Sequence, residues 1–199
     1  MTQLIMEIIN WSEITKENFS LSRNFQNGSA LCIGSFDGPH RGHYEIFKKV
    51  LSHSDKNSLK SIIVTFSRPV TGIKKQNDYL GDISTLDQRL SVFSSLGFDY
   101  CVLIDFSEAF AGLSGEEFFS ILKNKLNIKY ICEGLDFKCG HKGSFKMNEI
   151  ILWGKKNGVE TEFIQLVLEE GERISSSKIR KMLKEHKENE ARSLLTALP

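Results

Sequence analysis

The sequence is poor in cysteine and has no cysteines spaced for a common zinc site. Four cysteines occur in 199 residues, and no two of them form a Cys-x-x-Cys pair. Cys32, Cys101 and Cys132 lie in apolar, strand-like runs, which predicts buried free thiols in a reducing compartment. Cys132, Cys139 and His141 could together bind a metal, but their spacing fits no common zinc pattern. We therefore do not expect these three residues to form a zinc site.

The sequence also lacks a long apolar run and a large excess of charge of either sign. The formal net charge is +1 and no long basic stretch occurs, which argues against nucleic acid as a main partner. The apolar run near the N-terminus is short and is broken by Glu7, so it fits neither a secretory signal nor a transmembrane helix. We expect a cytoplasmic protein without a membrane partner. Its length and its 40% apolar content predict one domain over 1–199, with room for a small appendage.

Strand-like and helix-like segments alternate along the chain, a pattern typical of α/β proteins with a parallel sheet flanked by helices. The expected strands are the apolar run that ends at Ile33, Ser61–Phe66, Tyr100–Ile104, Lys129–Glu133 and Glu160–Val167. Helices are expected to start near Tyr44, after Ser84, at Ser114, at Asn148 and at Ser176. Gly97 should end the second helix, and Glu117 stands at the capping-box position of the third. The stretch from Ser67 to Ile83 has no clear period and is long enough to be a functional loop.

The segment from Leu31 to His43 carries the clearest functional signal. Its apolar start predicts a buried strand, Gly34 and Gly38 permit a sharp turn, and a helix follows. Unpaired N–H groups at the start of such a helix, together with the helix dipole, attract phosphate. His40 and His43 could direct their imidazoles at the same anion, because histidine donates N–H bonds and can carry positive charge near neutral pH. Without this strand, turn and helix, a His-x-x-His pair would more often be structural.

The spacing His-x-Gly-His is similar to the signature of the nucleotidylyltransferase superfamily, and the run from Gly34 to Gly38 resembles its flavin branch. Further segments resemble the bacterial FAD synthetase family in its FMN adenylyltransferase module, and they follow the family's order. These segments are Ser84–Leu90, Gly97–Tyr100, Phe106–Ala111, Gly134–Gly140 and Arg173–Arg180. The resemblance implies a Rossmann-like nucleotidylyltransferase fold. It also implies an enzyme that transfers AMP from ATP to FMN and releases FAD and pyrophosphate.

The resemblance implies roles for individual residues. His40 and His43 would stabilise charge on the α-phosphate and on the departing pyrophosphate, with Arg180 clamping the departing phosphates. The expected ATP-binding residues are Gly34, Ser35, Phe36, Asp37, Gly38, Gly42, Asp136, Ser175, Ser176 and Ser177. Magnesium is expected to accompany the triphosphate, although no dense carboxylate cluster in the sequence demands a protein-held metal.

Several of these residues also have an ordinary structural explanation. The serines at 175–177 precede a helix and could serve as N-caps alone. Asp136 follows a strand and could simply form a turn, although open parallel sheets bind ligands at that edge. Asp37 could bind the nucleotide, a metal or its own turn.

The flavin side of the site departs from the family pattern. The resemblance implies that Thr65, Phe66, Arg68 and Pro69 contact FMN, but one proline of the family's Phe-x-Pro-x-Pro is absent or shifted here. Arg68 could bind the FMN phosphate or remain a solvated loop charge. Cys139 replaces the phenylalanine that is usual in the family, which leaves the expected pocket wall smaller.

The end of the sequence is the largest departure from the family. Bacterial members usually continue through a Leu-Gly-Arg-Pro linker into a riboflavin kinase module, whereas this sequence ends with Leu194–Pro199. The different linker favours a natural end, in which case a separate riboflavin kinase or a flavin importer would supply FMN. A truncated protein would instead have lost its kinase half. Two other functions stay open: transfer to another acceptor, and a flavin- or nucleotide-binding module without catalysis.

Overall fold

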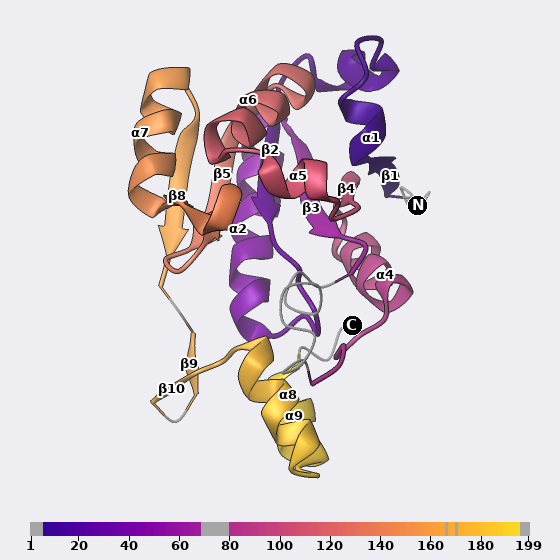
Figure 1. Ribbon diagram of the computed structural model, residues 1–199, viewed down its shortest axis with the longest axis vertical. Coiled ribbons are helices and arrows are strands. Elements are labelled where there is room, and N and C mark those ends of the chain that lie inside the picture. The colour runs from indigo at the N-terminus through magenta and orange to yellow at the C-terminus, as the bar shows by residue number, and fades with distance from the viewer. Residues whose placement is uncertain (1–5, 69–79, 166, 170, 196–199) are drawn as a thin grey trace.

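A six-stranded parallel sheet forms the centre of the computed structural model, which describes residues 6–68, 80–165, 167–169 and 171–195 (Figure 1). The strand order is β1-β4-β3-β2-β5-β8, and every neighbouring pair is parallel. The strands are β1 (Glu7–Asn10), β2 (Ser29–Ile33), β3 (Lys60–Phe66), β4 (Tyr100–Ile104), β5 (Ile128–Gly134) and β8 (Glu160–Ile164). The predicted α/β class, with a parallel sheet between helices, is confirmed.

Helices cover both faces of this sheet (Figure 1). They are α1 (Trp11–Ile14), α2 (Arg41–Asn57), α4 (Leu86–Leu96), α6 (Gly115–Leu126) and α7 (Met147–Asn157). On one face, Phe47 of α2 and Phe93 of α4 join an apolar cluster with Cys32 and Cys101. On the other face, side chains of α1, α6 and α7, among them Phe119, form a second cluster. Each face therefore has its own core.

Local signals in the sequence account for where two of these helices begin. Thr85 caps α4 and forms a capping box with Gln88, and Gly97 ends the helix in the left-handed region at φ 91°. Ser114 and Glu117 form the capping box of α6. Both predicted helix starts are confirmed. They could be predicted from the sequence because their capping hydrogen bonds join residues only three positions apart.

The chain after β8 differs from the expectation. β8 ends at Ile164, three residues before the predicted end at Val167. The helical region expected from Ser176 onward consists of two helices, α8 (Ser176–Lys184) and α9 (Glu188–Leu194). The break falls at His186, whose φ of 59° is incompatible with a continuing right-handed helix. Ile174, Ile179, Ala191 and Leu194 form a separate apolar cluster that holds the two helices together.

Several short elements carry no clear sequence signal. The edge strand β1 is one, since its four residues alternate little in polarity. The others are η1 (Ser20–Phe25), α5 (Glu108–Gly112), β6 (Lys138–Cys139), η2 (His141–Gly143), β7 (Phe145–Lys146), β9 (Leu168–Glu169) and β10 (Glu172–Arg173). The strands β6 and β7 pair antiparallel, as do β9 and β10. These elements depend on neighbours rather than on their own periodicity.

The predicted free thiols are confirmed. Cys32, Cys101 and Cys132 are buried, Cys139 is partly buried, and none forms a disulfide. Burial raises the pKa of Cys101 and of Cys132 to about 12. Within the described residues, no three potential ligands of the His, Cys, Asp and Glu types gather as a metal site would require. Nor does any described helix have the length and apolar composition needed to cross a bilayer.

The topology identifies the edge of the sheet where a ligand is expected. β3, β4 and β1 lie on one side of β2, whereas β5 and β8 lie on the other. The switch point of this open sheet is therefore between β2 and β5. In such sheets, ligands bind outside the carboxyl ends of the strands at the switch point.

Candidate functional site

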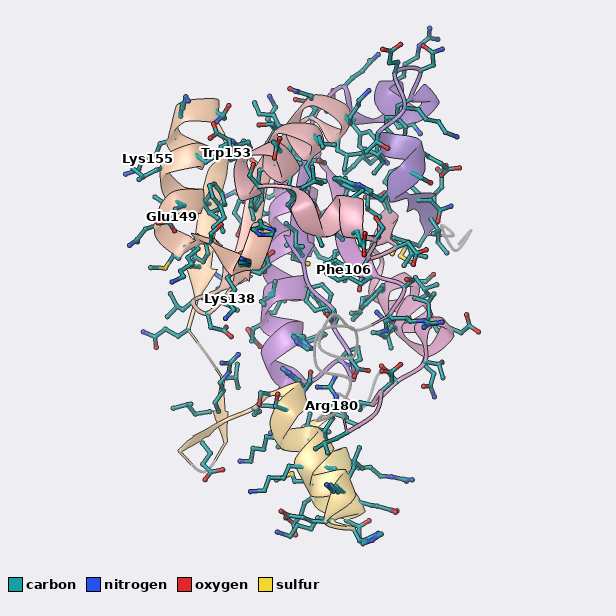
Figure 2. All side chains as sticks on the ribbon, viewed as in Figure 1. Phe106, Lys138, Glu149, Trp153, Lys155 and Arg180 are labelled. Atoms are coloured by element: carbon teal, nitrogen blue, oxygen red, sulfur yellow. The ribbon has the colours of Figure 1, made fainter. Side chains whose placement is uncertain are left out.

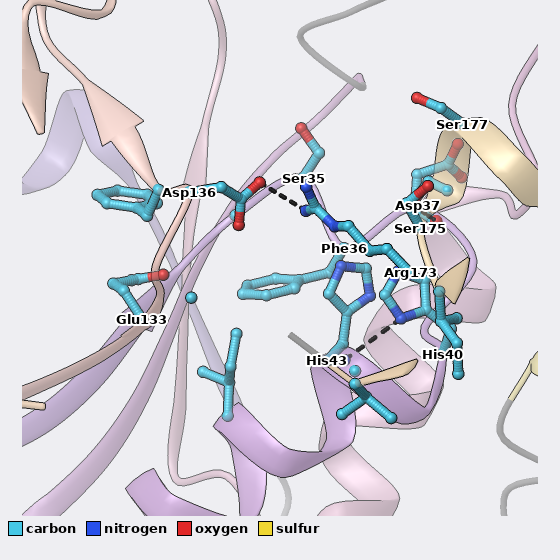
Figure 3. Close-up of a pocket in the computed structure, with 18 of the residues that line it drawn as sticks. Ser35, Phe36, Asp37, His40, His43, Glu133, Asp136, Arg173, Ser175 and Ser177 are labelled. Atoms are coloured by element: carbon cyan, nitrogen blue, oxygen red, sulfur yellow. Dashed lines mark hydrogen bonds and ion pairs between the residues drawn. The ribbon is translucent and has the colours of Figure 1, made fainter. Parts of the chain in front are cut away.

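A cavity of about 290 Å³ opens at this switch point. The segment after β2, the ends of β5 and β8, and the start of α8 form its walls (Figure 3). The predicted site residues that line it are Gly34, Ser35, Phe36, Asp37, His40, Gly42, His43, Asp136, Ser175, Ser176, Ser177 and Arg180. The structure therefore brings together segments that lie more than a hundred residues apart in the sequence.

The two histidines stand at the start of α2, as the sequence predicted. His40 is the N-cap residue, and its Nδ1 accepts a long hydrogen bond from the His43 backbone N–H at 3.4 Å. The two rings stack with centroids 3.6 Å apart. His43 Nδ1 is buried and has no partner among the described groups. A buried, unpaired ring nitrogen beside a cavity is a group that a ligand can satisfy.

Both imidazoles are neutral in this structure near pH 7. Burial, followed by the positive charge of Arg173, lowers the pKa of His40 to about 4. Burial, His40 and Arg173 together lower the pKa of His43 well below its usual range. These surroundings therefore disfavour the positive charge that histidine can carry near neutral pH. A phosphate bound beside the stacked rings would favour the protonated form and raise both pKa values.

The glycines and Phe36 shape the wall beside the histidines. The Phe36 ring is buried and meets His43 edge-on at 5.2 Å. A Cβ atom at Gly34 would lie 2.9 Å from that ring, and one at Gly42 would lie 3.2 Å from the His40 ring. Gly38 does not line the cavity; its N–H donates to Ser84 Oγ at 2.8 Å, and φ is +60°. The absence of side chains at Gly34 and Gly42 therefore leaves room for the Phe36 and His40 rings in this wall.

Asp37 and Arg180 form a buried ion pair beneath the cavity. Arg180 donates to the Asp37 carboxylate at 2.5 Å and to the carbonyl oxygen of Gly81 at 2.9 Å. The same carboxylate accepts the backbone N–H groups of Ile83 and Ser84. Of the alternatives open for Asp37, the structure favours a structural one, although the carboxylate binds across to distant segments rather than its own turn. The geometry also favours a positioning role for Arg180 over the predicted phosphate clamp. In Figure 2, Arg180 lies where α8 meets the rest of the molecule.

The three serines before α8 have different surroundings. Ser175 is the N-cap and accepts the Lys178 N–H at 3.2 Å. Ser176 Oγ donates to the Asp37 carbonyl at 2.8 Å. Ser177 is exposed at the cavity wall. Capping therefore explains Ser175, whereas the Ser177 hydroxyl and the start of α8 are available to an anion.

Two charged residues of this pocket were not among the predicted site residues. Arg173 forms an exposed ion pair with Asp136 at 2.5 Å, drawn as a dashed line in Figure 3. Glu133 is 2% exposed and accepts the Ile33 N–H at 2.6 Å. A signal was present for both, because Glu133 is an acid inside an apolar strand and Arg173 begins the segment that resembles the family.

Three of the predicted flavin residues, Thr65, Phe66 and Arg68, do not line this cavity. The Thr65 hydroxyl is buried, donates to the Ser35 carbonyl at 3.2 Å and accepts from Arg89 at 3.2 Å. Phe66 packs against other aromatic rings, and Arg68 is exposed. Pro69 lies outside the described residues. Thr65 and the fully buried Arg89 thus brace the loop after β2, which is a structural role.

A comparison with known protein families finds a match over most of the chain. The model of the FAD synthetase family matches residues 22–178. The protein named bifunctional riboflavin kinase/FMN adenylyltransferase in Buchnera aphidicola subsp. Schizaphis graminum is 31% identical over 176 residues, which are 87% of this chain and 56% of that protein. The protein of the same name in Escherichia coli K12 is 29% identical over 179 residues, with 88% and 56% coverage. The chain therefore spans about half the length of these curated relatives.

A solved structure shares the fold. It is described as a macrolide-efflux protein from Streptococcus pneumoniae and is similar over 96% of this chain and 60% of its own, with a TM-score of 0.78. At 24% sequence identity, this similarity bears on the architecture alone. The family model, in contrast, covers most of the sequence, including the histidines and the start of α8. The chain belongs to the FAD synthetase family.

Proposed function

We propose that this chain transfers the adenylyl group of ATP to FMN, forming FAD and releasing pyrophosphate. The observation that carries the proposal is the cavity in which the stacked His40 and His43 face the start of α8. Membership of the FAD synthetase family supports the choice of substrates. Two relatives that cover the site are named for the same activity.

The proposed reaction requires little covalent help from the protein. A phosphate oxygen of FMN attacks the α-phosphorus of ATP, a new P–O bond forms, and the bond to the β-phosphate oxygen breaks in line. The protein's task is to hold the two phosphates and to stabilise the spreading charge. Magnesium enters with the triphosphate as part of the substrate.

The site residues have separate parts in this proposal. His40 and His43 donate hydrogen bonds to the phosphates, and the negative charge of the nucleotide favours their protonation. Ser177 and the N–H groups at the start of α8 bind the β- and γ-phosphates. Arg180 and Asp37 hold α8 against the loop after β2. FMN would approach from the side of Phe66 and Arg68, outside the nucleotide cavity.

The first test is product formation by the purified chain. With ATP and magnesium, FMN should yield FAD and pyrophosphate, whereas riboflavin should yield neither. FAD is separated by chromatography, and pyrophosphate is measured by a coupled assay. Binding of ATP and FMN without either product would indicate a binding module, and turnover of another phosphate acceptor in place of FMN would redirect the substrate assignment.

Replacement of His43 tests the mechanism. His43→Ala should lower kcat by about 100-fold or more, because its hydrogen bonds strengthen in the transition state, while the Kd for ATP changes by less than about tenfold. The control is His53→Ala, which removes a histidine from the same helix outside the cavity. Unchanged kcat in His43→Ala would contradict the assigned role.

A further inference from the structure

The Glu133 side chain fills a gap in the sheet next to the cavity. β2 and β5 pair as far as Leu31 and Ile131. Two residues further on, the Ile33 N–H donates to the Glu133 carboxyl at 2.6 Å instead of to a backbone carbonyl of β5. The acid thus replaces a ladder hydrogen bond where the strands separate.

One oxygen of Glu133 remains for a ligand. Oε1 accepts from Ile33, and this is the one hydrogen bond that the carboxyl group makes within the part of the chain that the structure describes. Only 2% of the Glu133 surface is exposed, and the residue lines the cavity. Figure 3 shows its carboxyl group directed into the pocket. A buried polar atom without a partner is costly unless a ligand completes its hydrogen bonds.

The charge of this group suits a nucleotide. Burial raises the pKa of the Glu133 carboxyl well above its usual range, and the nearby Asp136 carboxyl raises it further. A neutral acid does not repel a triphosphate, as a carboxylate would. It also offers an O–H donor beside an acceptor oxygen.

The position of Glu133 in the pocket indicates which part of a nucleotide it meets. Figure 3 shows Glu133 and Asp136 on one side of the pocket and His40, Ser175 and Ser177 on the other. Phosphates held on the side of the histidines and α8 would place the nucleoside on the side of β5. Phe137, Ile164 and Val167 also line the cavity. Their apolar side chains would pack against the faces of the base, whereas the polar Glu133 is suited to a ribose hydroxyl.

We propose that Glu133 is a specificity residue whose second carboxyl oxygen forms a hydrogen bond with a ribose hydroxyl of ATP. This inference rests on the proposed function for the identity of the nucleotide. It adds a contact that distinguishes a ribonucleotide from its deoxy analogue. The contact is made at the switch point of the sheet, where β2 and β5 separate.

The test compares ATP with its 2′-deoxy and 3′-deoxy analogues in three proteins, with Kd measured by calorimetry without FMN. The wild type should bind ATP roughly 3- to 10-fold more tightly than one of the two analogues, the contribution expected of one hydrogen bond. Glu133→Gln retains a donor and an acceptor and should keep this preference. Glu133→Met has a similar volume without either group and should lose it. Inosine triphosphate differs from ATP at the edge of the base, so its affinity should be lower than that of ATP by the same factor in all three proteins.

The ratio between ATP and its analogues separates a direct contact from general damage. If Glu133→Met weakens ATP and both deoxy analogues equally, Glu133 is structural and the inference fails. It also fails if the variant changes the ratio for inosine triphosphate instead. If the wild type binds ATP but all three proteins show the same preference for ATP over its deoxy analogues, this inference fails and the proposed function stands. If the wild type does not bind ATP, the proposed function fails as well.

Discussion

At the scale of single residues, the site is defined by buried polar groups whose ordinary charge is suppressed. His40 and His43 are neutral because they are enclosed and face Arg173. Burial, and to a lesser extent the nearby Asp136, raises the pKa of the Glu133 carboxyl well above its usual range. All three would gain from a polyanionic ligand that brings hydrogen-bond partners with it. These surroundings are therefore compatible with a phosphate-containing ligand.

The lowered pKa of His40 predicts how acid affects the folded protein. Between pH 6.5 and about 4, the unfolded chain binds more protons at this position than the folded chain, so stability falls as the pH falls. A shift of this size corresponds to about 3 kcal/mol at most. His40→Gln should therefore lose less stability than the wild type between pH 7 and pH 4. Urea denaturation at several pH values measures this difference.

A surface histidine provides the control for this prediction. His186 is exposed and has φ of 59°, a conformation that asparagine tolerates. His186→Asn should therefore follow the wild type through the same pH range. Parallel acid profiles for His40→Gln and the wild type would show that His40 is not held neutral by burial.

At the scale of elements, one close contact attaches the β6–β7 hairpin to the start of α6. A Cβ atom at Gly115 would be closer to the Phe145 side chain than van der Waals contact allows. A Cβ atom at Gly140 would lie 2.5 Å from the Gly115 nitrogen. Gly115→Ala should destabilise the protein by about 1–3 kcal/mol, the usual cost of overpacking. The free energy of unfolding in urea measures this effect.

Gly112, three residues earlier, gives a matched control. A Cβ atom there would meet nothing within 4 Å, and its φ is outside the left-handed region. Gly112→Ala should be neutral or stabilise the protein by up to about 1 kcal/mol, since alanine restricts the unfolded chain. Equal effects of the two substitutions would refute the assigned close contact.

At the scale of the whole molecule, the Asp37–Arg180 pair joins three distant parts of the chain. It connects the loop after β2, the segment from Gly81 to Ser84 and helix α8. Removal of one partner leaves a buried charge, so Asp37→Asn and Arg180→Met should each cost about 3 kcal/mol or more. The double variant should cost less than the sum by more than about 1 kcal/mol. A double-mutant cycle in urea measures the coupling.

An exposed ion pair is the control for this double-mutant cycle, because its coupling free energy is measured without burial. Lys156 and Glu116 lie 3.8 Å apart, with side chains 77% and 63% exposed. Their coupling should stay below about 1 kcal/mol. Additive effects at Asp37 and Arg180 would mean that the pair does not join these segments.

The sequence by itself determined the features that depend on neighbours along the chain. The start of α4 at Thr85, the box at Ser114 and the histidines at the start of α2 follow from caps, glycines and apolar spacing within a few residues. The same local signals were insufficient for β1 and for the break at His186, because edge pairing and packing between α8 and α9 decide those.

Contacts between distant segments determine the surroundings of each candidate site residue. Asp37 and Arg180 pair across more than a hundred residues, and their partners could not be inferred from spacing. The suppressed charge of the histidines and of Glu133 arises from burial by segments remote in sequence. Hydrogen-bond partners and dielectric environment are properties of the packed molecule, whereas the sequence specifies which groups are available to be packed.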